Sequence, residues 1–170
     1  MSDEQLLGTT PKVTRILMSE EAIYGLILVS GMIVVSYDLT GTSLSALITV
    51  VVTVLVFFAA HVYAGTLSRL AATDGKAGVP ESIGGAVHHS LGMLLVSLAP
   101  VAILLLGVTR VVDDDFAIWC ALSIDALALG VLGWVAVAKW TRHFWPRLAS
   151  ALVTAAFGGI LIMMKAFIHH

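Results

Sequence analysis

Residues 44–70 read LSALITVVVTVLVFFAAHVYAGTLSRL, and this stretch decides the fold. It contains no Asp, Glu, Lys or Arg before Arg69, next to its end. An α-helix rises about 1.5 Å per residue, so roughly 20 apolar residues cross a hydrocarbon layer about 30 Å thick. The stretch is longer than that, and Thr49, Thr53, Phe57 and His61 follow one of its faces. We therefore expect it to be a transmembrane helix.

Four more apolar stretches are spread over the rest of the chain. They cover residues 22–37, 83–107, 116–139 and 148–168. Of the 170 residues, 59% are apolar and only 12% are charged, which leaves too little polar surface to cover a soluble globule. The prediction is an all-α membrane helix bundle of five transmembrane helices. It forms one domain over residues 19–170, after a short cytoplasmic segment at residues 1–18.

Basic residues in the short connections orient this bundle, because Lys and Arg near helix ends are retained on the cytoplasmic side. One side holds Lys12, Arg15, Arg69, Lys76, Lys139, Arg142 and Arg147. The other side holds Asp38, and Arg110 beside the three acidic residues 113–115. We expect the N-terminus inside and the C-terminus outside, with the lipid bilayer as the main partner. The net charge of −2 indicates no nucleic-acid partner.

Polar side chains gather near the cytoplasmic ends of three predicted helices. Glu21 and Tyr24 open the first, His61 lies about 12 Å from the inner end of the second, and the pair 88–89 lies about 8 Å into the third. We expect Glu21, Tyr24, His61 and either His88 or His89 to form one layer. Adjacent helical residues point about 100° apart, so only one histidine of the pair faces a given site. A carboxylate with two imidazoles is suited to a proton relay or a divalent metal.

Simpler interpretations of the same residues stay open. Ser19 is a suitable N-cap, and the helix dipole favours negative charge at Glu20 and Glu21. His61 is also explained as an interhelical hydrogen-bonding residue, and His88 and His89 as residues at the level of the lipid headgroups.

Asp125 lies about 13 Å inside the fourth predicted helix, counted from residue 116. A bare carboxylate at that depth costs several kcal/mol, so it needs a partner or a proton. Lys165, near the outer end of the last helix, is the best charge partner, unless its long stem extends outward to the headgroups. The two interpretations of Asp125 are a neutral acid hydrogen-bonded to a neighbouring helix, and a gate or ion ligand midway along a path.

Small residues follow two faces of the last predicted helix. One face holds Ser150, Thr154, Gly158, Leu161 and Lys165, and the adjacent face holds Ala151, Ala155 and Gly159. Small residues at this spacing favour close helix packing over a pore. Five spans are few for a monomeric pore, so we expect a homo-oligomer that associates through these faces.

Three short segments carry a resemblance to a known group. Glu-Glu-Ala-Ile-Tyr-Gly at 20–25, Val-Leu-Val-Phe-Phe-Ala-Ala-His-Val-Tyr-Ala at 54–64 and Met-Lys-Ala-Phe-Ile-His at 164–169 resemble small, mostly actinobacterial integral membrane proteins. By motif position the resemblance carries over Glu21, Tyr24, His61, Tyr63, Lys165 and His169. It implies a multi-pass protein of the bacterial inner (plasma) membrane and no particular activity.

A fainter similarity links the chain to bacterial relatives of the lysosomal potassium channel. It consists of an acid-led first helix, the histidine at 61 and Ser-Leu-Ala-Pro at 97–100. The Arg and Phe-Ser-Asp signature of those channels is absent.

Three functions from different classes fit these residues. The first is a small oligomeric ion channel or transporter that moves protons or cations through Glu21, Tyr24, His61, Asp125 and Lys165. The second is a non-transporting accessory or scaffold subunit that binds another membrane protein. The third is a haem or metal protein that uses His61 with His88 or His89. No phosphate loop, His-Glu-x-x-His or Gly-x-Ser-x-Gly motif indicates an enzyme.

Overall fold

The computed structural model describes residues 19–168, and this part of the chain is entirely helical apart from its connections. The helices are α2 (Glu20–Thr40), α3 (Ser43–Ala72), α4 (Val79–Val108), α5 (Asp114–Ala138) and α6 (Phe144–Ile168). All five are long and apolar enough to cross a membrane. The predicted all-α class and the five apolar helices are confirmed, with each helix extending at one or both ends beyond its apolar stretch.

Capping residues set several helix ends. The Ser19 side chain accepts a hydrogen bond from the backbone N–H of Ala22, as the N-cap prediction required. Gly41 ends α2 in the left-handed region at φ 66°, and its N–H donates to the Tyr37 carbonyl at 2.7 Å. Thr42 then caps α3 through its side chain. Because two residues alone separate α2 from α3, the two helices run antiparallel as neighbours.

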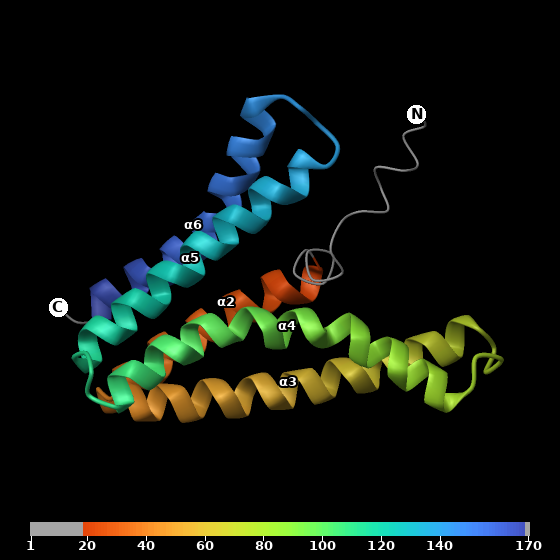
Figure 1. Ribbon diagram of the computed structural model, residues 1–170, viewed down its shortest axis with the longest axis horizontal. Coiled ribbons are helices and arrows are strands. Elements are labelled where there is room, and N and C mark those ends of the chain that lie inside the picture. The colour runs from red at the N-terminus through yellow and green to blue at the C-terminus, as the bar shows by residue number, and fades with distance from the viewer. Residues whose placement is uncertain (1–18, 169–170) are drawn as a thin grey trace.

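The five helices alternate in direction, so the bundle has two distinct ends. We call the end at which α2 begins, with connections 73–78 and 139–143, the proximal end. The other end, with connections 41–42 and 109–113, is the distal end. The ribbons converge at the distal end, whereas the α5–α6 hairpin diverges from the α3–α4 hairpin toward the proximal end (Figure 1). α2 is the most deeply buried helix and α6 the least.

The main hydrophobic core occupies the distal half of the bundle. Its buried members are Val29, Ile33, Val34, Tyr37, Ala46, Val50, Val54, Leu104, Ile118, Ala121 and Leu122. They come from the last turns of α2 and α4 and the first turns of α3 and α5. Apolar packing therefore makes up most of the distal half, and buried polar residues occur along the whole length of α2.

Two helices extend past the beginning of α2. α3 and α4 each have 30 residues and α2 has 21, which corresponds to about 45 Å and about 31 Å of helix. The rings of Tyr24 and His61 lie 6.4 Å apart, so the first turn of α2 sits beside the middle of α3. The α3–α4 hairpin therefore lies beside the first turn of α2 and extends beyond it.

The small residues of α6 pack against α5, as expected. A Cβ placed on Gly158 would lie 2.8 Å from the Cα and Cβ atoms of Ala126, and Ser150 donates a hydrogen bond to the Gly133 carbonyl at 2.9 Å. By contrast, Gly159 faces open space. Part of the surface that we expected to mediate self-association is therefore already used within one chain.

Candidate functional site

Polar and aromatic side chains form three layers at successive heights along α2, and each layer contains at least one buried polar residue. The proximal layer consists of Glu20, Glu21, Tyr24, His61 and His89. The middle layer consists of Ser30 and Asp125, and the distal layer of Tyr37, Asp115, Trp119 and Lys165. Since α2 contributes to every layer and is the most deeply buried helix, it is the axis along which the polar groups are arranged.

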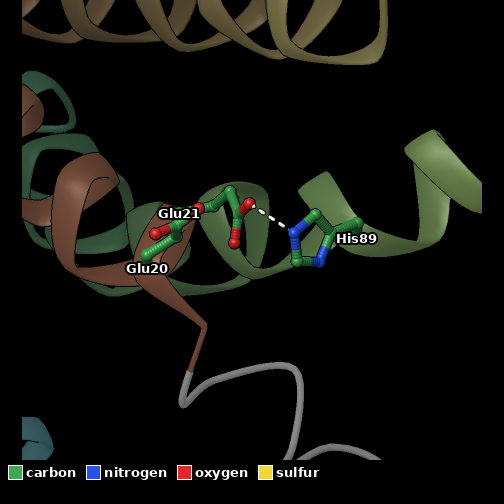
Figure 2. A group of neighbouring side chains, drawn as sticks. All are labelled: Glu20, Glu21 and His89. Atoms are coloured by element: carbon green, nitrogen blue, oxygen red, sulfur yellow. Dashed lines mark ion pairs between the residues drawn. The ribbon is translucent and has the colours of Figure 1, made fainter. Parts of the chain in front are cut away.

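Glu21 and His89 form the centre of the proximal layer. Nε2 of His89, from α4, lies 2.8 Å from Oε1 of Glu21, from α2 (Figure 2). Glu21 is only 6% exposed, whereas the His89 side chain is 65% exposed and is charged only when protonated. Among residues 19–168, Oε2 of Glu21 has no hydrogen-bond partner. A buried carboxylate oxygen without a partner is unfavourable, so this atom needs an explanation.

A cavity of about 280 Å³ adjoins this pair and is lined by Glu20, Glu21, Tyr24 and His61. His61 is held in place by a 2.9 Å hydrogen bond between its Nδ1 and the carbonyl of Phe57, one turn earlier in α3. This bond leaves Nε2 as the ring nitrogen available for other partners. The structure thus brings together Glu21, Tyr24 and His61, as the depth arithmetic predicted.

The histidine pair of α4 divides as the helical geometry requires. Both rings are exposed, and it is His89 that reaches Glu21. Ligand atoms of Glu20, Glu21 and His89 lie within 4.8 Å of one another and make the one potential metal group found among the described residues. This set differs from the predicted metal ligands, which were His61 with His88 or His89, because the first turn of α2 places two carboxylates beside His89.

Asp125 lies in the middle layer and is completely buried at 0% exposure. Its Oδ2 accepts a 2.8 Å hydrogen bond from the hydroxyl of Ser30 in α2. Within the described residues, Oδ1 has no hydrogen-bond partner. The carboxyl group therefore forms a hydrogen bond to a neighbouring helix, which is one of the two arrangements we considered. Only one of its two oxygen atoms takes part in a hydrogen bond within the described residues.

The expected pairing of Asp125 with Lys165 is wrong. Nζ of Lys165 lies 2.8 Å from Oδ1 of Asp115, ten residues before Asp125 in α5. α5 and α6 run antiparallel, so the last turn of α6 lies beside the first turn of α5. Reaching Asp125 would require Lys165 to extend about 15 Å along the helix axis. Nor does Lys165 extend outward to solvent, because it is 3% exposed.

The distal layer encloses this lysine. Tyr37 donates a 3.2 Å hydrogen bond to Oδ1 of Asp115. The Lys165 ammonium also lies 4.2 Å from the ring centroid of Trp119 and 4.7 Å from that of Tyr37. One carboxylate and two aromatic faces therefore compensate a buried positive charge. The layer ties α2, α5 and α6 together at the distal end.

Two buried serines of α4 lie near the heights of the proximal and middle layers. Ser90 and Ser97 are both buried, and they lie seven residues apart on one face of the helix. α2 and α4 run in the same direction, with Gly25 packed against Met93. Ser90 accordingly lies just beyond the level of Glu21, and Ser97 lies close to the level of Ser30. α4 thus adds one buried hydroxyl group near the height of each of these two layers, and about 10 Å of helix separates the two hydroxyls.

Several residues of the three layers were missed by the sequence interpretation. Ser30, Asp115 and Trp119 were not singled out, and Glu20 was considered only as a charge near the helix dipole. Asp115 and Trp119 stand four residues apart, so the sequence alone places them on one face of a helix. The signal for Ser30 was its place on the apolar face of α2. Lys12, Arg15 and His169 lie outside the described residues.

No protein-family model, curated protein or solved structure matches this chain. The function is therefore inferred from the geometry of these layers.

Proposed function

We propose that this chain is a multi-pass protein of the bacterial inner membrane that moves protons, with its N-terminus inside, its C-terminus outside and Asp125 as the midway proton carrier. The observation that carries this proposal is the state of Asp125. Its side chain is fully buried, and within residues 19–168 it accepts one hydrogen bond, from a hydroxyl, and its Oδ1 has no hydrogen-bond partner. Burying a bare carboxylate in this way is costly, and taking up a proton removes the cost.

The small number of ligands at Asp125 favours a proton over a metal cation. Hard cations such as Ca²⁺ take 6–8 oxygen ligands, and Mg²⁺ takes six. The described contacts of Asp125 supply one carboxyl group and one serine hydroxyl. A proton needs a single acceptor oxygen, and Oδ1 is available for it.

Glu21 and His89 are the proximal exchange point for protons in this proposal. Histidine changes its charge near physiological pH, and the exposed ring of His89 can exchange protons with water while it contacts the buried Glu21. Glu21 and Ser30 are nine residues apart, or about 14 Å along α2. Water molecules bridging Ser90 and Ser97 would complete this route. The homo-oligomer stays a prediction, supported by the small number of helices and the open surface at Gly159.

Proton flux in proteoliposomes tests this proposal. A pH gradient is imposed, and the internal pH of the vesicles is followed with a trapped dye. Asp125→Asn and Glu21→Gln should abolish the protein-dependent flux, because neither amide side chain can release a proton. His61→Ala tests whether the ring beside the proximal cavity is required.

Asp38→Asn is the matched control, because Asp38 is an exposed acid of α2 near its distal end. It should leave the flux unchanged at the same protein incorporation. Equal flux from the unmodified protein and Asp125→Asn would remove Asp125 from the mechanism. If no variant and no gradient produced flux above empty liposomes, the accessory or scaffold function would take its place.

A further inference from the structure

We propose that Glu20, Glu21 and His89 form a binding site for a divalent transition-metal cation such as Zn²⁺ at the proximal end of the bundle. The ligand atoms of these three residues already lie within 4.8 Å of one another. Figure 2 shows both glutamates at the start of α2 and the His89 imidazole directed toward them from α4. The site is thus assembled from the first turn of α2 and the third turn of α4.

The second carboxylate oxygen of Glu21 points to a ligand independently of this cluster. Glu21 is 6% exposed, and its Oε2 has no hydrogen-bond partner within residues 19–168. His89 satisfies only Oε1. A metal ion bound between the carboxylates and the imidazole would satisfy this buried oxygen, which has no partner in the described part of the chain.

The ligand types select the class of metal. Ca²⁺ and Mg²⁺ prefer sites made entirely of oxygen, whereas imidazole together with carboxylate suits Zn²⁺ and its neighbours in the transition series. Three protein ligands leave a fourth position of a tetrahedral zinc ion open for water. The adjacent cavity of about 280 Å³ has room for that water, and the exposed His89 ring gives the ion a way in.

The negative charge of the two glutamates outweighs the positive end of the α2 helix dipole, so the site favours a dication. The N-terminus of α2 carries a partial charge of about +0.5, which repels a cation. Two ionised glutamates supply four times that charge with the opposite sign, at shorter distance from the ion. Their mutual repulsion is relieved when a divalent ion lies between them.

Metal binding to the purified full-length protein in detergent tests this proposal directly. Zn²⁺ binding is followed by equilibrium dialysis with elemental analysis, and Co²⁺ is used as a coloured substitute. All samples carry His169→Ala and His170→Ala and a tag without histidine, so that terminal histidines do not contribute. We expect one Zn²⁺ per chain and at least tenfold weaker binding in His89→Ala and Glu21→Gln.

Two further variants distinguish the loss of a metal ligand from a general effect on folding. Glu20→Gln changes an exposed side chain and should also weaken binding at least tenfold without disturbing the helices. His88→Ala removes the adjacent exposed histidine and should leave binding unchanged. Unchanged binding in Glu20→Gln and His89→Ala would overturn the proposal, as would the absence of any bound metal in the parent protein.

Zinc bound to Glu21 and His89 would occupy the proposed proton exchange point, so proton flux is measured on metal-free protein and zinc binding is measured separately. A protein that binds zinc at Glu20, Glu21 and His89 but shows no proton flux would keep the metal site and refute only the proposed function.

Discussion

At Asp125, the structural contact and the proposed function involve different oxygen atoms of one carboxyl group. Its hydrogen bond to Ser30 joins α5 to α2, and its free Oδ1 contributes nothing to that join. A side-chain amide of the same size could also accept the hydrogen bond from Ser30. In the proposed function, what the carboxyl group adds is the ability to gain and lose a proton.

We predict that Asp125→Asn leaves the free energy of unfolding within about 1 kcal/mol of the parent value, because the amide oxygen still accepts from Ser30. Unfolding in mixed detergent, followed by circular dichroism, measures this change. The same variant should lose proton flux. A loss of several kcal/mol would show that the carboxyl group serves structure instead.

Lys165 is predicted to be structural. Lys165→Met removes the ion pair with Asp115 and the contacts with the Trp119 and Tyr37 rings. Asp115 is half exposed and stays hydrated, so we expect a loss of about 1–3 kcal/mol in unfolding free energy. Lys139→Met, at an exposed position, is the control and should change it by less than about 0.5 kcal/mol. Equal effects of the two substitutions would contradict the buried role of Lys165.

The candidate site could be predicted from the sequence in part. Ionisable residues are rare in apolar helices, so Glu21, His61 and Asp125 were visible at once. Their partners were not, because a partner depends on which helices touch and at what height. Lys165 illustrates this, since its charge suggested Asp125 and its height along α6 selected Asp115.

At the level of the helices, the α5–α6 pair depends on small residues. Gly158→Ala places a methyl group 2.8 Å from the backbone of Ala126, so the two helices must separate. We predict a loss of about 1–3 kcal/mol in unfolding free energy. Gly159→Ala adds the same methyl group facing open space and should be neutral or slightly stabilising, by up to about 1 kcal/mol. Equal destabilisation by both would indicate that Gly159 is also packed, for example against a second copy.

Helix positions could be predicted from the sequence, but their arrangement could not. Apolar runs near membrane length located all five helices, and Ser19 and Gly41 set ends that follow capping rules. Helices that are apolar on every side do not indicate which face meets a neighbour. The divergence of the α5–α6 hairpin toward the proximal end (Figure 1) therefore had no signal in the hydrophobic pattern.

For the whole molecule, the first prediction concerns orientation in the membrane. In a Cys120→Ala background, Ala72→Cys lies at the proximal end and Val111→Cys at the distal end. Both replace exposed neutral residues and keep the basic side chains that set orientation. In spheroplasts, whose plasma membrane is intact and accessible, a membrane-impermeant thiol reagent should label Val111→Cys and not Ala72→Cys. The reverse pattern would invert the bundle.

Voltage-driven proton uptake into vesicles is the most direct measurement of whether this chain carries protons. Proteoliposomes loaded with potassium and a pH-sensitive dye are diluted into potassium-free buffer, and valinomycin then makes the interior negative. We predict that vesicles with the unmodified protein acidify faster than empty vesicles, and that vesicles with Asp125→Asn match empty ones. If vesicles with the unmodified protein acidified only as fast as empty vesicles, that result would contradict proton transport by this chain.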